Sequence, residues 1–342
     1  MKILIIGGTK FIGAHLARHL LEAGHTLTLL NRGQQAPPFP LDLETIHCDR
    51  AELPAKRPEL AGRSFDVAID MICMNTSNIR QTIDALEGIV PRICVISSMD
   101  VYRARDILAG SDPSPVDNSP LTETSPLRSR LFPYQQGFKP GDDLYQIYDK
   151  IPVEATLQTL TKSDWTICRL PCVYGPGDYQ RRLLPFSKRF TDKRSTILMD
   201  RDWAAWRWTW GYVEEVARAI AAAALHPAGA NQIFNIGEEQ TPSFQERFAL
   251  CSDILDWPLK TTLAKAEKLP SNEDWAGLNL AQHWIADTSK IRSLLGYQEI
   301  LTPKECLQKT LDWELANPPE SVEPTRFDYA AEDAYISSQS SN

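Results

Sequence analysis

The sequence predicts an α/β fold built as a doubly wound parallel sheet, and three observations lead to this prediction. The chain opens with an unbroken aliphatic run, Ile3–Ile6, which is typical of a strand buried on both faces. Glycines at positions 7, 8 and 13 follow this run and lead into a helix with one apolar face. Further aliphatic runs then alternate with helical patterns, as they do in parallel sheets with right-handed crossovers.

The stretch Gly7–Gly13 has the properties of a turn that binds the phosphates of a dinucleotide. Ile12, Leu16 and Leu20 form the apolar face of the following helix, and Thr26–Leu30 is expected to be the second strand. In such a unit the amides at the helix start and the helix dipole bind pyrophosphate, while glycines allow a close approach. The alternative is an ordinary turn between a strand and a helix.

Two departures from the usual glycine pattern bear on the choice of dinucleotide. Lys10 takes the place of the middle glycine, where its side chain narrows the approach to the phosphates and its ammonium can pair with one. Asn31 and Arg32 follow the second strand, where an NAD enzyme typically offers Asp or Glu to the ribose hydroxyls. Because two cations and no carboxylate would face a 2′-phosphate, the sequence favours NADP(H) over NAD(H). The alternative for Arg32 is a solvated loop residue.

The composition is that of a globular protein. The 342 residues predict one large or two modest domains, and a hydrophobic content of 43% is enough for a sizeable core. The formal net charge of -8 disfavours a general nucleic-acid binder. Because the chain shows neither a basic leader nor a long apolar run, we expect a cytoplasmic protein with no membrane span. The seven cysteines and six histidines lack zinc-ligand spacing, which predicts no metal site.

More aliphatic runs and helical patterns extend the predicted sheet. Strands are expected at Leu43–Ile46, Phe65–Asp70, Arg92–Ile96, Trp165–Arg169 and Gln232–Ile236, and helices at Thr76–Gly88, Ile151–Lys162, Glu214–Leu225 and Ser243–Leu255. Ligands of parallel sheets bind at the carboxyl ends of the strands. This rule places along one crevice the glycine turn, Asp49, residues 70–74 and residues 98–102.

Three segments break this regular order. Residues 103–140 predict a long loop, and a sharp turn is expected at Pro171–Asp178. A last long helix is expected from Thr302, with a capping box, before a polar tail in which Phe327 and Tyr329 serve as anchors and residues 337–342 fray.

A locally basic and aromatic segment stands out between residues 181 and 210 of this acidic chain. Its members are Arg181, Arg182, Phe186, Lys188, Arg189, Phe190, Lys193, Arg194, Arg201, Trp203, Trp206, Arg207, Trp208 and Trp210. Cations and flat rings are suited to a nucleotide diphosphate. The alternative is that the last three tryptophans alternate along a strand and pack in the core, with solvated arginines around them.

Four stretches together resemble a known superfamily. They are Gly7–Gly13, Ser97–Tyr102, Arg169–Asp178 and Phe234–Gly237. They are similar to segments of the extended and atypical short-chain dehydrogenases/reductases, among them the nucleotide-sugar epimerases and dehydratases. With Lys10 in the turn and Asn31-Arg32-Gly33 after it, the chain looks most like an atypical group that includes chloroplast stem-loop RNA-binding proteins. The resemblance runs from residue 1 to about residue 315.

The resemblance implies a Rossmann-type fold with a smaller C-terminal substrate domain. The expected division is a dinucleotide-binding domain of residues 1–174 with 205–238, a substrate domain of 175–204 with 239–317, and a polar tail of 318–342. The implied activity is that of an NAD(P)-dependent epimerase/dehydratase-like oxidoreductase acting on a sugar nucleotide or a related small substrate. NADP is the expected cofactor, NAD the alternative. Because relatives are often dimers, a homodimer is implied by analogy.

The resemblance also implies roles for single residues. Ser98 matches the family's catalytic serine or threonine, although it could simply cap a strand end, and Asp49 matches a residue that contacts adenine. Asp100 falls where sugar dehydratases carry glutamate. The position before it, which holds their general acid, is occupied by Met99 here, and this disfavours a 4,6-dehydratase. The expected cofactor-binding residues are Gly7, Gly8, Thr9, Lys10, Phe11, Ile12, Gly13, Asn31, Arg32, Asp49 and Lys150. Asp100, Arg182 and Arg207 are the expected substrate-binding residues.

The family's Tyr-x-x-x-Lys motif is incomplete. Lys150 matches the lysine, but Gln146 occupies the tyrosine position. In the intact motif the tyrosine and the lysine share one helix face, so that the lysine ammonium lowers the pKa of the phenol. On a regular helix Tyr145 and Tyr148 would lie about 140° and 160° away from Lys150. Pro152, however, predicts the first helical turn, so these tyrosines belong to the loop before it.

We therefore expect Tyr148 to be the catalytic acid/base, with Tyr145 or no phenol at all as alternatives, and Lys150 to be catalytic, ribose-binding or solvated. Two further interpretations of the whole chain stay open. One is an RNA-binding protein on a retained dinucleotide fold, whose binding would weaken with salt. The other is a cofactor-binding regulator without chemistry, which the incomplete motif supports.

Overall fold

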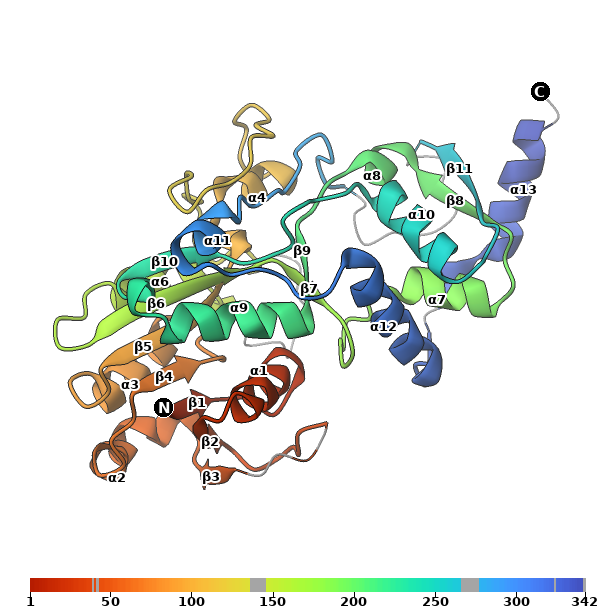
Figure 1. Ribbon diagram of the computed structural model, residues 1–342. Helices are drawn as coiled ribbons and strands as arrows, with labels where there is room; N and C mark the ends of the chain where they lie inside the picture. The colour runs from red at the N-terminus through yellow and green to blue at the C-terminus, as the bar shows by residue number, and fades with distance from the viewer. Residues whose placement is uncertain (39, 41–42, 136–145, 266–276, 323, 341–342) are drawn as a thin grey trace.

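A seven-stranded parallel sheet lies at the centre of the computed structural model, which describes residues 1–38, 40, 43–135, 146–265, 277–322 and 324–340. The strands follow the order β10-β6-β5-β4-β1-β2-β3 (Figure 1). Their bounds are β1 Lys2–Ile6, β2 Thr26–Asn31, β3 Glu44–His47, β4 Val67–Asp70, β5 Arg92–Ser98, β6 Asp164–Leu170 and β10 Gln232–Asn235. Every neighbouring pair in this sheet is parallel, which confirms the predicted fold class.

Helices cover both faces of the sheet. This cover is needed because successive apolar side chains of each strand point to opposite faces. The main ones are α1 (Phe11–Glu22) and α9 (Val213–Leu225), which pack together, and α3 (Thr76–Leu86) and α6 (Lys150–Leu157), which also pack together. Ile3 and Ile5 belong to the core that contains residues of α1 and α9. Leu4 and Ile6 belong to the other core, with residues of α3 and α6. The first aliphatic run is therefore buried on both sides.

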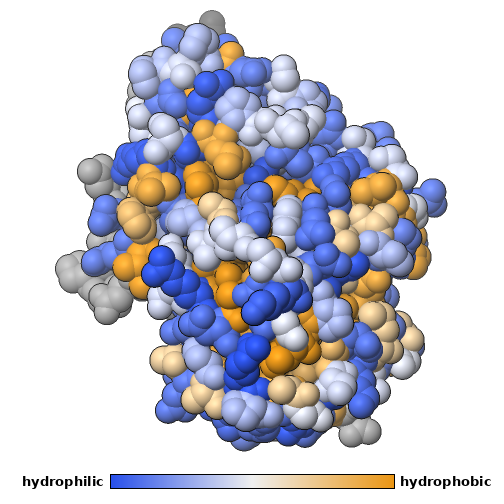
Figure 2. All heavy atoms as spheres, turned by 90° about the vertical axis from the view of Figure 1, so that its left-hand side faces the viewer, coloured by the Kyte–Doolittle hydropathy of each residue, from blue (hydrophilic) through white to orange (hydrophobic). Residues whose placement is uncertain are grey.

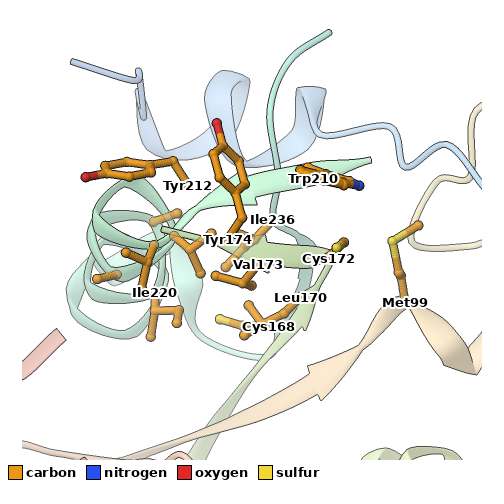
Figure 3. Close-up of a cluster of buried hydrophobic side chains, with 14 of the residues drawn as sticks. Met99, Cys168, Leu170, Cys172, Val173, Tyr174, Trp210, Tyr212, Ile220 and Ile236 are labelled. Carbon is orange, nitrogen blue, oxygen red and sulfur yellow. The ribbon is translucent and has the colours of Figure 1, made fainter. Parts of the chain in front are cut away.

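A second group of elements stands beside the central sheet (Figure 1). It contains the parallel pair β8 (Thr196–Asp200) and β11 (Lys260–Ala264), with α7 (Leu184–Thr191), α8 (Arg201–Ala205), α10 (Phe244–Ile254), α12 (Pro303–Ala316) and α13 (Tyr329–Ser340). Between the two groups, β7 (Cys172–Tyr174) pairs with β9 (Trp210–Tyr212), and their side chains join the buried cluster of Figure 3. The domain boundaries expected above stay a prediction.

Two predicted helices end earlier than their sequence pattern suggests, because side-chain oxygens accept the backbone N–H groups that follow them. Helix α3 stops at Leu86, and Gly88 then adopts a φ of +78° and donates its N–H to Ser163 Oγ at 2.9 Å. Helix α6 stops at Leu157, since the N–H of Thr161 donates instead to Glu87 Oε1 at 3.0 Å. The predicted ends at residues 88 and 162 are wrong for this reason.

A loop, a turn and a strand prediction are also wrong in part. Residues 103–108 form α4 (Arg103–Leu108), which follows η2 (Met99–Val101) directly, so the expected long loop begins with a helix. The turn expected at Pro171–Asp178 contains the short strand β7. The tryptophans do not alternate along one strand, because β9 begins only at Trp210 and Trp208 forms a single bridge to Trp284.

Smaller elements complete the described chain: η1 (Arg50–Lys56), α2 (Arg57–Ala61), η3 (Pro227–Gly229), α11 (Ser289–Leu295) and η5 (Pro324–Phe327). The capping box expected at Thr302 is present, closed by Glu305, and α10 begins with another, formed by Ser243 and Glu246. None of the described helices combines the length and apolarity that crossing a membrane requires. The face shown in Figure 2 carries hydrophobic side chains among hydrophilic ones, as most protein surfaces do.

The C-terminal segment is anchored on α7, as predicted for Phe327 and Tyr329. The guanidinium of Arg189 lies 5.0 Å from the centre of the Phe327 ring, and the Tyr329 hydroxyl donates to Asp192 Oδ2 at 2.6 Å. Arg189 Nη2 also donates to Glu332 Oε1 at 2.6 Å, with both side chains buried. With this support α13 extends to Ser340, so the fraying expected from Ser337 is wrong as far as residue 340.

Replacing Glu332 by Ala is expected to lower the free energy of unfolding by about 3 kcal/mol, because Arg189 would stay buried without its carboxylate. The matched control is Asp333→Ala, which removes a carboxylate that is 58% exposed and pairs with Arg194. This control should cost at most about 1 kcal/mol. Denaturant unfolding of both variants measures the difference, and equal losses would contradict the anchoring role of Glu332.

Candidate active site

The glycine turn between β1 and α1 has the shape of a phosphate cradle. Gly7 and Gly8 have φ angles of +90° and +102°, which side chains rarely adopt. A Cβ on Gly13 would lie 2.5 Å from the Cα of Gly8, so only glycine lets the helix start approach the turn this closely. Lys10 makes no capping hydrogen bond with its side chain, and the first turn of α1 holds no acid. The amides at this helix start therefore suit an anion such as pyrophosphate.

Two cations stand at the edge of this cradle. The side chains of Lys10 and Arg32 are exposed, and neither forms an ion pair with an acid in the part of the chain that the structure describes. Asn31 shapes the turn after β2 by accepting the N–H of Gly33 at 2.7 Å. Asp49, expected near adenine, caps η1 by accepting the N–H of Ala51 at 2.9 Å.

Asp70, at the end of β4, has a structural role in an ion pair with Arg50. Its two carboxylate oxygens accept from Arg50 at 2.9 and 2.5 Å, and Oδ2 also accepts from the Thr82 hydroxyl at 2.6 Å. The side chain is fully buried. Because Arg50 from η1 neutralises this carboxylate, Asp70 itself is unsuited to bind a ligand, whereas Met71 and Ile72 lie next to Gly7 of the cradle.

A cluster of hydroxyl and carboxyl groups, called the proton-transfer cluster below, lies after β5. It consists of Ser98, Asp100, Tyr134 and Tyr148. Asp100 Oδ2 accepts from the Tyr148 hydroxyl at 2.9 Å and from the Tyr134 hydroxyl at 3.2 Å. Ser98 caps η2 by accepting the N–H of Asp100 at 3.2 Å, and its hydroxyl also bonds to Tyr148. The loop before α6 therefore brings Tyr148 to Ser98, as expected. Tyr145 lies outside the described residues.

Burial sets the protonation properties of this cluster. Asp100 is 3% exposed, and this burial raises the pKa of its carboxyl, against the lowering effects of Arg128 and of the Tyr148 hydrogen bond. Asp100 Oδ1 is buried and has no hydrogen-bond partner among the described residues. The pKa of Tyr148 is raised well above its ordinary value, first by burial and then by the negative charge of Asp100. A free Tyr148 phenolate is thus disfavoured next to a carboxyl of increased basicity.

Lys150 lies beside this cluster, with its ammonium near the Tyr148 ring. It is the first residue of α6, so the expected helix start at Pro152's turn is confirmed, and it is only 3% exposed. Its ammonium donates to the carbonyls of Cys73 at 2.6 Å and Ile96 at 2.9 Å, and lies 5.6 Å from the Tyr148 ring centre. Burial lowers its pKa. The alternative of a solvated lysine is wrong, because the strand ends of β4 and β5 enclose the ammonium.

The two arginines expected to bind substrate lie apart from this cluster. Arg182 donates to Asp178 Oδ1 at 2.9 Å and to Gln180 Oε1 at 2.6 Å. Arg207 is 47% exposed and lies 4.0 Å from Glu246. Among the described residues, neither side chain contacts Asp100 or Tyr148, so the structure does not bring them together with the third expected substrate ligand, Asp100.

The basic and aromatic segment is largely neutralised or buried by the rest of the chain. Arg181, Arg189 and Arg194 pair with Glu314, Glu332 and Asp333 of α12 and α13. Trp203, Trp206 and Trp210 are in the core. The expectation of open flat surfaces is therefore wrong for these three rings. The expectation of solvated arginines is also wrong where the C-terminal helices supply acids.

The family model described as "NAD dependent epimerase/dehydratase family" matches residues 3–134 and 146–237. The chain belongs to this family. The match contains the phosphate cradle, all four residues of the proton-transfer cluster and Lys150. Cofactor-dependent epimerases and dehydratases of this kind share the parallel sheet described above, so the fold and the resemblance inferred from the sequence are confirmed.

Individual relatives within the epimerase/dehydratase family are distant. The chain is 24% identical over 319 residues to chloroplast stem-loop binding protein of 41 kDa b from Arabidopsis thaliana, covering 87% of this chain and 75% of that protein. An NAD-dependent NDP-hexosamine 5,6-dehydratase of tunicamycin biosynthesis superposes with a TM-score of 0.67 at 20% identity, covering 93% and 98% of the two chains. UDP-glucose 4-epimerase from Thermotoga maritima, solved with UDP-glucose, superposes with a TM-score of 0.64 at 16% identity, covering 92% of this chain and 98% of that chain. These similarities establish the fold.

Tyr134 is the member of the cluster that the sequence did not reveal. It lies in the irregular segment after α4, 34 positions from Asp100, and no periodicity or motif marks it. The guanidinium of Arg105 lies 4.8 Å from the centre of its ring, and the Tyr148 ring lies 5.5 Å away. The only signal in the sequence is that the segment is too long for a simple connection, which predicts function without naming a residue.

Proposed function

We propose that this protein is an NAD(P)-dependent oxidoreductase or epimerase that acts on a hydroxyl or carbonyl group of a sugar nucleotide or a related small substrate. The observation that supports this most strongly is the hydrogen bond from Tyr148 to Asp100 beside Ser98, at the carboxyl end of β5. This is the sheet edge that also carries the phosphate cradle. Sugar nucleotides are proposed because they are named for the structural neighbours, a hexosamine dehydratase and an epimerase solved with UDP-glucose.

The residues present fit the cofactor, because the glycines leave room for a pyrophosphate that a Cβ at Gly13 would exclude. The nicotinamide ring of a bound cofactor would accept a hydride from a substrate carbon or return it. Ser98 would hold the substrate oxygen through its hydroxyl. Tyr148 would take the proton from that oxygen and pass its own proton to Asp100 Oδ2, so that no phenolate accumulates. Asp100 returns the proton by the same path when a carbonyl is reduced.

The test is to incubate the protein with NADP(H) or NAD(H) and with UDP- and dTDP-linked hexoses and their 4-keto forms. Cofactor absorbance detects net redox chemistry, and proton NMR of the sugar detects epimerisation. We expect at least one of these substrates to turn over. Bound cofactor without turnover of any substrate would overturn the proposed enzymatic function and favour a regulator that binds the cofactor without chemistry.

For the cofactor we propose NADP(H), because Lys10 in the glycine turn and Arg32 directly after β2 are exposed and have no acidic partner among the described residues. Replacing Arg32 by Ala is expected to weaken NADPH binding about tenfold, the effect of losing one charge-assisted hydrogen bond. Binding of NADH, which lacks the 2′-phosphate, should change much less.

Fluorescence titration of both reduced cofactors measures this difference. Arg103→Ala is the matched control, because it removes an arginine of α4 and not the one that follows β2. Equal weakening of NADH and NADPH by the Arg32 substitution would contradict the proposed contact with the 2′-phosphate.

A second candidate function is RNA binding, which the name of the Arabidopsis relative supports. The pairing of Arg181, Arg189 and Arg194 with acids of α12 and α13 argues against the basic segment as an open RNA surface. A stem-loop RNA retained at low ionic strength and released steeply with added salt would support this function. The absence of such binding would leave the enzymatic proposal alone.

A further inference from the structure

Three separate segments of the chain carry the proton-transfer cluster. Asp100 lies in η2 after β5, Tyr134 in the irregular segment after α4, and Tyr148 directly before α6. Oδ2 of Asp100 accepts hydrogen bonds from both phenols, which belong to different segments. Because a hydrogen bond weakens steeply when its distance or angle departs from the ideal, the three backbones must keep a fixed arrangement. The cluster therefore depends on the groups that fix these segments relative to one another.

Arg128 is bonded to all three of these segments. Its side chain is fully buried, and each guanidinium nitrogen donates to a different residue. Nε donates to the carbonyl of Asp100 at 2.5 Å, and Nη1 donates to the carbonyl of Arg130 at 2.5 Å. Nη2 donates at 2.9 Å to Oδ1 of Asp149, the residue that follows Tyr148. A planar guanidinium can serve three acceptors in fixed directions, which an ammonium on a flexible stem cannot reproduce.

Asp149 joins two of the same segments from the other side. Its carboxylate is fully buried. Oδ1 accepts the N–H of Ile151 at 2.9 Å and so caps the start of α6. Oδ2 accepts the N–H of Phe132 at 2.7 Å, two positions before Tyr134. One carboxylate thus ties the helix start that follows Tyr148 to the segment that carries Tyr134.

Stability alone gives little reason for a charged pair at this place. The desolvation of two buried charges offsets most of their attraction, so apolar side chains of similar volume are often equally stable. The pair instead provides directed bonds, which apolar contacts lack. These bonds reach the backbone groups of Asp100, Arg130, Phe132 and Ile151.

We propose that Arg128 and Asp149 are positioning residues, whose ion pair holds the three segments in the arrangement that lets Tyr148 and Tyr134 donate to Asp100. Arg128 hydrogen-bonds to Asp100 through the backbone carbonyl of that residue, so it acts on the cluster by placing it. The effect of the pair on turnover rests on the proposed function, whereas its effect on the Asp100 carboxyl needs no substrate. When the arrangement is lost, the two phenol hydrogen bonds are withdrawn from the carboxylate.

The charge of Arg128 also acts on Asp100 and has to be separated from its hydrogen bonds. The cations Arg128 and Lys150 and the phenols Tyr148 and Tyr134 all lower the pKa of the Asp100 carboxyl, against the raising effect of burial. Arg128→Lys retains a positive charge but cannot make the three directed hydrogen bonds. A rise in the pKa of Asp100 in this variant therefore reports the displaced phenols rather than a lost charge.

The test is carbon NMR of the full-length protein, isotope-labelled at the aspartate carboxyl groups and titrated with pH. The signal of Asp100 is identified by its absence from Asp100→Asn. We expect its titration midpoint to lie at a higher pH in Arg128→Lys than in the wild type, with Tyr148→Phe displaced in the same direction. With a substrate that the wild type turns over, Arg128→Lys should also lower kcat about 10²-fold at a nearly unchanged KM, as a misplacement of about 1 Å can do.

Arg189→Lys is the matched control, because it makes the same exchange in another buried ion pair, that of Arg189 with Glu332. It should leave the Asp100 midpoint and kcat at their wild-type values. A wild-type midpoint in folded Arg128→Lys, or an equal displacement in Arg189→Lys, overturns the positioning role. If the wild type turns over no substrate, the proposed function fails, while the midpoint still decides the role of the pair.

Asp149→Asn provides the same test if Arg128→Lys does not fold. Its amide oxygen can still accept from Ile151 and Arg128, but its amide nitrogen cannot accept the N–H of Phe132. Loss of the Asp149 charge by itself would lower the pKa of Asp100, because one negative charge is removed from its surroundings. A midpoint at higher pH in Asp149→Asn therefore supports the positioning role, and a midpoint at lower pH contradicts it.

Discussion

Replacing Asp100 by Asn is expected to lower kcat by about 10²- to 10⁴-fold, the usual contribution of a positioned general acid or base. The amide can still accept the Tyr148 hydrogen bond through its oxygen, but it cannot take up the proton. Because burial raises the pKa of Tyr148, its phenol cannot deprotonate the substrate unless Asp100 receives its proton. Single-turnover measurements with bound cofactor separate this chemical step from binding.

The pH dependence provides an internal check. Burial raises the pKa of Asp100 above the ordinary value of 3.8, so its base form is lost at a higher pH than for a solvated aspartate. Alcohol oxidation in the wild type should therefore fall as the pH drops through this raised pKa. The residual activity of Asp100→Asn should lack this acidic limb. An unchanged limb in the variant would assign it to another group.

The same pKa shift predicts the effect on stability, and the melting temperature of the variant tests whether misfolding causes the loss of activity. A carboxyl with a raised pKa in the folded state stabilises the protein when protonated and loses this contribution as the pH rises through that pKa. At neutral pH the buried Asp100 charge thus costs stability, and Asp100→Asn should not lower the melting temperature. Tyr148→Phe should reduce kcat similarly, and Tyr134→Phe far less if Tyr134 only positions Asp100. Full activity of Tyr148→Phe would remove this tyrosine from the mechanism.

Local patterns in the sequence predicted the parts of the site that depend on neighbouring residues. Pro152 was sufficient to place the start of α6 near Lys150, and hence to put Tyr148 in a loop. The glycines at 7, 8 and 13 predicted the cradle, because few other sequences allow a strand and a helix to meet so closely. Aliphatic runs of four to seven residues likewise predicted the strands of a sheet that is buried on both faces.

Contacts between distant segments were not predictable in the same way. The sequence alone suggests that Asp70 is available to a ligand, but Arg50, 20 positions earlier, neutralises its carboxylate. The charge of Arg189 is cancelled by Glu332, 143 positions later, so composition alone overstated the basic surface. Tyr134 reached Asp100 through an irregular segment that has no period to follow. Pairings of this kind depend on the tertiary fold, and a single sequence carries no local signal for them.

The second large effect is expected at Gly13, where Gly13→Ala should weaken cofactor binding at least tenfold. The added Cβ would lie 2.5 Å from the Cα and 3.0 Å from the N of Gly8, and both of these are backbone atoms. No side chain can rotate away, so α1 must move off the turn. Overpacking of this kind costs about 1–3 kcal/mol. Its relief would displace the backbone amides that bind the phosphates. Titration with NADPH and NADH should show the loss for both cofactors.

This common loss distinguishes the cradle from the ribose side, where Arg32→Ala should affect NADPH alone. Gly62→Ala is the matched control, because a Cβ there meets its nearest neighbour, the Glu59 carbonyl oxygen, at an ordinary 3.7 Å. It should leave both affinities unchanged. If Gly13→Ala binds both cofactors normally while remaining folded, the turn does not hold the pyrophosphate, and Lys10 would have closed the cradle to the cofactor. The enzymatic proposal would then lose its cofactor site.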